Sequence, residues 1–88
     1  AAHREVAIHA ACCIERFGAL TVHQLERLGT GPRTFAVLQA SGTIEGWFRE
    51  VGDGAYGLTA KARRGLDRYP EAARYYRQQL KGASPPSL

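Results

Sequence analysis

The sequence has two cysteines and no long apolar run, and these scarcities exclude several classes of protein. Because Cys12 and Cys13 are adjacent and no second pair exists, neither a disulfide framework nor a zinc site is indicated. No stretch is long and apolar enough to cross a bilayer, and the first residues lack the pattern of a signal peptide. We therefore expect a cytoplasmic protein without membrane contact. The start at Ala1, without an initiator methionine, suggests a domain cut from a longer protein.

Groups able to carry catalysis are equally scarce. The three histidines lack the spacing of metal ligands, and the serines have no organised histidine and acid partners. The eight Asp and Glu residues are dispersed among basic residues, with no pair near a hairpin that could hold Mg²⁺. From these residues we expect no catalytic site, no metal and no cofactor. The sequence thus predicts that this chain is not an enzyme by itself.

The length and the charge of the chain indicate its size class and its possible partners. With 88 residues, of which 44% are hydrophobic and 23% charged, the chain should form one ordinary soluble domain with a single small core. The net charge is +4, and eight of the twelve Lys and Arg residues lie in residues 45–88. A basic balance with a pI near 9.5 favours polyanionic partners such as nucleic acid, and it is equally typical of a solvated basic surface.

The first predicted helix covers residues 3–17. Its apolar side chains recur at spacings of three and four, which is the pattern of one buried helical stripe. This stripe consists of Val6, Ala10, Cys13, Ile14 and Phe17. We therefore expect Cys13 to be buried as a small hydrophobic residue, and Cys12 to face outward or to lie at a boundary.

A helix-turn-helix pattern follows. Thr21 and Gln24 have the spacing of a capping box, so the second helix should begin at Val22. The short link at residues 29–31 contains two glycines and suits a tight turn after a helix end. A proline then opens a third helix, predicted over residues 32–41. Two helices joined by such a turn are typical of a helix-turn-helix unit.

The third helix has two predicted faces. Phe35 and Leu38 should point to the core, and the outward face should carry Arg33, Ala36, Val37, Ala40 and Ser41. If this is a recognition helix, Arg33 would meet a phosphate or a guanine edge, with Ser41 or Thr34 in support. A face with one arginine, a valine and two alanines is equally compatible with docking to another protein domain.

A β-hairpin is predicted after the third helix. Two runs rich in aromatic and β-branched residues, 47–51 and 55–59, flank the turn Gly52-Asp53-Gly54, whose glycines tolerate the positive φ of a tight reversal. Thr59 is then a plausible N-cap for a basic helix over residues 60–68. A further helix over residues 70–81 combines two stripes. Its apolar stripe is Tyr69, Ala73, Tyr76 and Leu80, and its basic stripe is Arg74, Arg77, Gln78 and Lys81.

This order of elements predicts the fold class. It is mostly α-helical with a small β-hairpin, a winged helix-turn-helix with three helices, a two-stranded wing and C-terminal helices. We expect one domain over residues 1–81 and a disordered tail over residues 82–88, which are rich in proline, serine and glycine.

The hairpin residues also resemble a known family. The runs Gly46-Trp47-Phe48-Arg49-Glu50-Val51 and Gly54-Ala55-Tyr56-Gly57-Leu58-Thr59 are similar to the wing of a C-terminal winged-helix domain in a bacterial family. The larger N-terminal part of those proteins resembles a PD-(D/E)xK nuclease core, and the family is labelled a phosphodiesterase. A similar wing occurs in abortive-infection antitoxin regulators. The resemblance covers about residues 4–68.

The resemblance implies an accessory nucleic-acid-binding module beside a catalytic domain. The family's catalytic carboxylates and lysine have no positions here to which they could be assigned. Duplex DNA is the expected partner, bound mainly by phosphate contacts, with Arg33 in the major groove and Arg49 on the wing. The predicted DNA-binding residues are Arg33, Thr34, Val37, Ser41, Arg49, Lys61, Arg63 and Arg64.

An alternative hypothesis comes from the same helix face. A winged helix that binds protein would use Val37 and Ala40 to dock on its own upstream catalytic domain or on a second copy in a homodimer. In that case the basic helices would only be solvated. The sequence leaves both hypotheses open.

Overall fold

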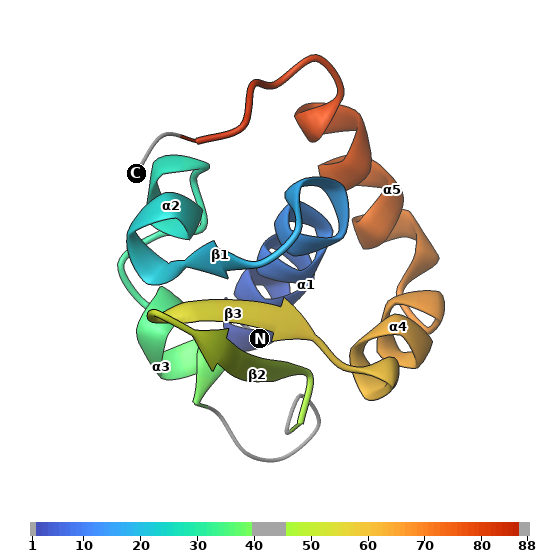
Figure 1. Cartoon of the computed structure of the whole chain (residues 1–88). Helices are drawn as coiled ribbons and strands as arrows, with labels where there is room; N and C mark the ends of the chain where they lie inside the picture. Colours follow the sequence, from blue (N-terminus) through green and yellow to red (C-terminus); the bar gives the residue numbers. More distant parts are fainter. Residues whose placement is uncertain (1, 40–45, 87–88) are drawn as a thin grey trace.

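Eight elements follow one another in the described part of this computed structural model, which covers residues 2–39 and 46–86 (Figure 1). In chain order they are α1 (Ala2–Phe17), β1 (Leu20–Thr21), α2 (Val22–Arg27), α3 (Thr34–Leu38), β2 (Phe48–Gly52), β3 (Ala55–Leu58), α4 (Ala60–Asp67) and α5 (Pro70–Leu80). The three strands form one antiparallel sheet in the order β1-β3-β2. This arrangement confirms the mostly helical, winged helix-turn-helix class.

The sheet has one more strand than the sequence predicts. The hairpin of β2 and β3 is confirmed, and its turn residues Asp53 and Gly54 both have positive φ, 52° and 75°. β1 adds to the other edge of β3, where Leu20 pairs with Tyr56. A strand of two residues is too short to show an alternating pattern, and its partner lies far along the chain. It therefore could not be recognised from the sequence.

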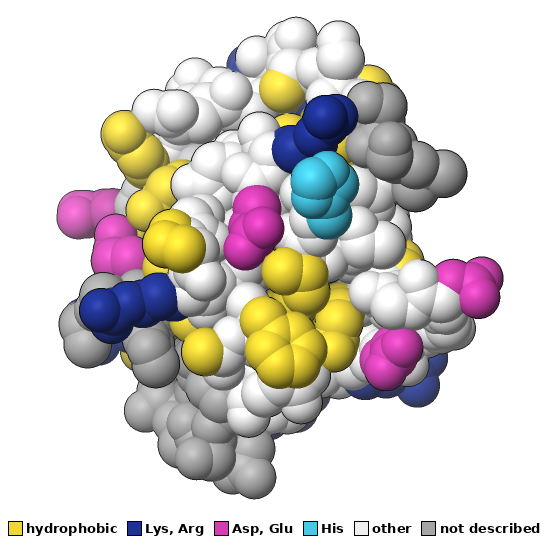
Figure 2. Space-filling model, turned by 90° about the vertical axis from the view of Figure 1, so that its left-hand side faces the viewer, with side chains coloured by type: hydrophobic (Ala, Val, Ile, Leu, Met, Phe, Trp, Pro, Cys, Tyr) yellow, Lys and Arg dark blue, Asp and Glu magenta, His cyan; other side chains and the backbone are white. Residues whose placement is uncertain are grey.

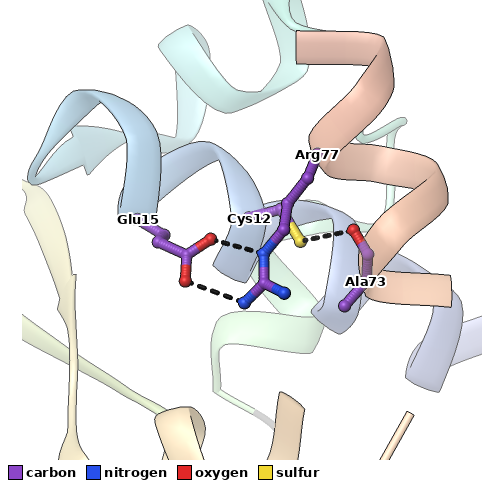
Figure 3. A network of polar contacts seen from close by, with 4 residues as sticks. All are labelled: Cys12, Glu15, Ala73 and Arg77. Atoms are coloured by element: carbon purple, nitrogen blue, oxygen red, sulfur yellow. Dashed lines mark hydrogen bonds and ion pairs between the residues drawn. The ribbon is translucent and has the colours of Figure 1, made fainter. Parts of the chain in front are cut away.

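Helix α1 is the centre of the core, and its predicted outward side is buried. Cys13 is fully buried as predicted, but the expectation for Cys12 is wrong, because this residue is only 1% exposed. The reason is that α5 packs along α1, so that the Cys12 thiol lies 3.8 Å from the carbonyl oxygen of Ala73 (Figure 3). Helix α1 is thus covered on two sides, which a single-stripe analysis does not anticipate.

The start of α2 is confirmed. Thr21 Oγ1 accepts from the Gln24 amide at 3.1 Å, and Gln24 Oε1 accepts from the Thr21 amide at 3.0 Å, which completes the capping box. Gly29 follows the helix end with a φ of 102°, a value that favours glycine. The start of α2 and the glycine turn after it therefore have the structure that the sequence predicts.

Helix α3 is shorter than predicted and is rotated about its axis. It ends at Leu38, and Phe35 is 58% exposed where burial was expected. Val37, expected on the outward face, is 1% exposed. Thr34 is fully buried: its hydroxyl donates to the Gly31 carbonyl at 2.6 Å. Because five helical residues give no repeated period, small differences in packing decide which side faces inward.

The wing is joined to α4 by a close contact. Thr59 caps α4 as predicted, accepting from the Ala62 amide at 3.3 Å. Trp47 is 2% exposed and lies on Gly65, where an added Cβ would stand 2.1 Å from Trp47 Cζ2. Only glycine leaves room for the indole at this point of α4. The wing and the C-terminal helices are therefore packed as one unit.

The C-terminal residues return toward the helix-turn-helix. In α5 the predicted apolar stripe is confirmed, since Ala73 and Leu80 are buried and Tyr69 and Tyr76 are partly buried. The segment after α5 then crosses to α2, where Gln24 Nε2 donates to the carbonyl of Pro86 at 3.4 Å (Figure 1).

Candidate nucleic-acid interface

A basic groove runs along α5. Residues spaced by three and four along this helix share one face, and here that face meets the end of α1 and the end of α4. The volume of this open groove is about 490 Å³. We call this hollow the α5 groove; its lining residues are Arg16, Leu66, Asp67, Pro70, Arg74, Arg77, Gln78 and Lys81.

One of its arginines is held by an ion pair. Arg77 Nε and Nη2 donate to the two carboxylate oxygens of Glu15, at 2.8 and 2.9 Å (Figure 3). This two-pronged hydrogen bond is the main cause that raises the pKa of Arg77. The pair connects α1 to α5 and fixes the direction of the guanidinium. It also offsets part of the charge of Arg77, so the remaining cations of the α5 groove carry most of its positive potential.

Cys12, which lies near this ion pair, and its neighbour Cys13 are buried thiols of low reactivity. Burial raises the pKa of the Cys12 thiol to about 11 and that of the Cys13 thiol to about 12. Both thiols are therefore protonated at neutral pH, and the thiolate is the nucleophilic and metal-binding form. Cys12 packs between α1 and α5, and Cys13 is buried in the core.

A second basic hollow lies between α4 and the start of the wing. Lys61, Arg64 and Arg68 lie on one face of α4, because they follow one another at helical spacing. With Trp47, Gly65 and Tyr69 they line a volume of about 190 Å³ that has no acidic side chain among its lining residues. We call it the Tyr69 cleft. The Arg4 guanidinium lies over the Tyr69 ring, 5.2 Å from its centre.

The two hollows lie on opposite faces of α4, because Leu66 and Asp67 are about half a helical turn from Lys61, Arg64 and Arg68. Arg68 and Tyr69 line the Tyr69 cleft, and the flanking residues Asp67 and Pro70 line the α5 groove. Together the hollows gather seven of the chain's twelve Lys and Arg residues. We refer to both hollows as the basic region.

The helix-turn-helix side has a different character. A groove of about 850 Å³ lies between α2, α3 and the hairpin, and no lysine or arginine is among its lining residues. Figure 2 shows the side of the molecule where α2 and α3 lie, with a group of hydrophobic side chains at its lower centre and acidic side chains beside it. We call this hollow the wing groove; it is lined by Thr21, Val22, His23, Phe35, Gln39, Glu50, Asp53, Gly54 and Tyr56.

Two of the residues that the third helix was predicted to present to DNA are buried. Thr34 and Val37 are buried, so neither side chain can reach a base edge or a partner protein. Ser41 and Ala40 lie outside the described residues. Arg33 is exposed just before α3. Of the residues expected to read the major groove, Arg33 is therefore the one that the described structure leaves at the surface.

Arg49 lies on the side of the hairpin away from the wing groove. In an antiparallel pair, residues opposite one another share a face, and neighbours in a strand alternate. Glu50 pairs with Tyr56, and both line the wing groove. Arg49 pairs with Gly57 and so faces the other way. The structure does not bring Arg33 and Arg49 to one hollow.

The predicted cations of α4 are brought together in part. Lys61 and Arg64 line the Tyr69 cleft, whereas Arg63 is exposed but lies outside its lining. The basic stripe of α5 was visible as helical spacing. Its meeting with Arg16 was not, because that contact depends on the packing of α1 against α5.

Residues 1–65 match the family model described as "Putative PD-(D/E)XK phosphodiesterase (DUF2161)". The chain belongs to this family. Comparisons with curated proteins and with solved structures returned no match. The resemblance to a nuclease-like family, first suggested by the hairpin residues, is thus confirmed for most of the chain.

Family membership corrects one expectation. The prediction that this chain is not an enzyme by itself is wrong, because a match to a phosphodiesterase family points to a nuclease-like enzyme. That prediction rested on the absence of paired carboxylates, of metal-ligand spacing among the histidines and of partners for the serines, whereas the family match covers residues 1–65 as a whole. Within residues 2–39 and 46–86 no group of three or more His, Cys, Asp or Glu side chains fits a metal ion. None of the helices described there is long and apolar enough to span a membrane.

Proposed function

We propose that this chain binds duplex DNA as the C-terminal winged-helix part of a phosphodiesterase-family protein. In this proposal the phosphates are held by the basic region of α4 and α5. The observation that carries it is the gathering of seven of the twelve cationic side chains in two hollows on either side of α4. Clustered cations on one region are the electrostatic signature of a protein that binds nucleic acid.

The length of the α5 groove suits a phosphate backbone. From Arg74 to Lys81 the helix axis advances by about 10 Å, at roughly 1.5 Å per residue. One strand of DNA rises by about 3.4 Å per phosphate along the duplex axis, but it also winds around that axis, so neighbouring phosphates are farther apart and this distance corresponds to roughly two phosphates. Arg16 and Arg77 flank the same path. The groove can therefore contact about two neighbouring phosphates of one strand.

The same geometry argues against base reading. One face of the Tyr69 ring is already covered by Arg4, which reduces its use as a stacking platform. The α3 helix offers Arg33 at the surface while Thr34 and Val37 are buried. Phosphate contacts position a duplex without specifying its sequence. We therefore expect binding of low sequence specificity.

A charge-reversal comparison tests this function. The double variant Arg74→Glu, Lys81→Glu removes two cations from the α5 groove, and the helix-turn-helix variant Arg33→Glu, Arg49→Glu makes the same change just before α3 and on the outer face of the hairpin. Fluorescence anisotropy with a labelled mixed-sequence duplex should show a loss of at least about tenfold in affinity for the first variant. The second should lose less than about threefold, since it shares only the change in net charge.

Salt dependence gives a second readout of the same experiment. The six cations of the basic region besides Arg77 set the largest number of released counterions, so the slope of log affinity against log salt should be no steeper than about −5. The α5 variant should have a shallower slope by roughly two. If the helix-turn-helix variant lost more affinity and more slope than the α5 variant, the basic region would not be the binding surface.

A further inference from the structure

One aromatic side chain of the wing groove is exposed and is not packed in the hydrophobic core. Phe35 is 58% exposed, although its neighbours in α3, Thr34 and Val37, are buried. It lines the groove together with Val22 from α2 and Tyr56 from β3. An exposed large apolar residue inside a concave surface is typical of a site that another molecule covers.

The walls of this groove are fixed by hydrogen bonds. Gln39 Nε2 donates to the Tyr56 hydroxyl at 2.8 Å, which ties the end of α3 to the sheet. Glu50 accepts from the Gly54 amide at 3.2 Å, so its carboxylate is held beside the hairpin turn. A wall that is already ordered loses little conformational entropy when a partner binds.

The charge of the groove selects the partner. Glu50 and Asp53 lie along its hairpin wall, and its lining includes no lysine or arginine. Two carboxylates repel a phosphate backbone and attract cationic side chains. A second copy placed groove to groove would oppose acid to acid. The occupant that fits is a basic protein segment with an apolar anchor.

We propose that the wing groove docks a protein segment in which an aliphatic or aromatic residue is flanked by lysine or arginine. The apolar anchor packs on Phe35, and the flanking cations pair with Glu50 and Asp53. This replaces the docking surface expected at Val37, which is buried. The inference is independent of DNA binding, because the wing groove and the basic region share no lining residue.

The test is a selection of random dodecapeptides displayed on phage against the 88-residue chain, followed by titration of the selected peptides in solution. The enriched sequences should combine one apolar residue with flanking lysine or arginine, and their binding should weaken as salt rises. Phe35→Ala should reduce their affinity by about tenfold or more, as expected for a central anchor contact. Glu50→Gln with Asp53→Asn should reduce it by about threefold or more.

Tyr75→Ala is the matched control, because Tyr75 is also 58% exposed but lies on α5, outside the wing groove. It should leave peptide affinity unchanged. The proposal is overturned if no peptide is enriched, if the enriched peptides are acidic, or if Tyr75→Ala weakens binding as much as Phe35→Ala. It is also overturned if the chain alone forms a dimer that Phe35→Ala dissociates, since the occupant would then be a second copy.

Discussion

The basic region and the wing groove belong to one winged helix but have opposite chemistry. The basic region gathers cations from α1, α4 and α5, whereas the wing groove combines Phe35 with two carboxylates. In many helix-turn-helix proteins the recognition helix carries the contacts to DNA. Here most of the positive charge lies on the C-terminal helices. Thr34 and Val37 of α3, which the sequence predicts to contact DNA, are buried. Shared architecture therefore does not decide which face binds a polyanion.

The largest expected effect on stability comes from a substitution at the contact between the wing and α4. Gly65→Ala would place a Cβ within 2.1 Å of Trp47 Cζ2, so the indole that joins the wing to α4 must move. We expect a loss of about 3 kcal/mol or more in the free energy of unfolding, measured by urea denaturation.

Gly57→Ala is the control for this substitution. Its Cβ would meet Val51 Cγ1 at 3.3 Å, and Val51 is 51% exposed and free to turn aside. We expect a change below about 1 kcal/mol. Equal losses in the two variants would show that the Trp47 contact is not what joins the regions.

The next effect tests which residue of α3 belongs to the core. Val37→Ala removes two methyl groups from a fully packed position, and we expect it to cost about 2 kcal/mol in urea denaturation. Phe35→Ala should cost less than about 0.5 kcal/mol, because most of the ring is already in water. A larger loss for Phe35→Ala would mean that α3 has the rotation the sequence suggested, and the wing groove would then lose its anchor.

A smaller effect concerns the packing of α1 against α5 behind the basic region. Burial raises the pKa of the Cys12 thiol from 9.0 to about 11, and that of Cys13 also rises. The unfolded chain loses these protons near pH 9 while the folded chain keeps them. The free energy of unfolding should therefore fall as pH rises above about 9, and this contribution is fully present below that pH.

Denaturation at about pH 8 and about pH 10 measures this dependence. The double variant Cys12→Ala, Cys13→Ala lacks both thiols and should have a flatter pH profile than the natural sequence. Tyrosine and lysine titrate in the same range, so the difference between the two proteins is the relevant quantity. Identical profiles would contradict the burial of the thiols.

Local signals in the sequence predicted much of the fold. The capping box at Thr21 and Gln24, the Asp53-Gly54 turn and the Thr59 cap each depend on residues within four positions, and all three are confirmed. The fold class followed from their order. The winged-helix class could thus be predicted from interactions between residues close in the sequence.

What the sequence could not supply depends on contacts between distant segments. Burial of Cys12 requires α5, more than sixty residues away. The fit of Trp47 on Gly65 and the meeting of Arg16 with the α5 stripe require the same packing. Periodicity describes one element at a time and cannot show which cations share a hollow.

The most direct test of the account is an NMR titration of the isotope-labelled chain with a mixed-sequence DNA duplex, at low and then near-physiological salt. We expect amide shifts concentrated in residues 61–68 and 74–81, which fade as salt rises, with little change in residues 34–39 and 50–54. Shifts concentrated at residues 33–39 and in the hairpin, with α5 unaffected, would contradict the assignment of DNA binding to the basic region.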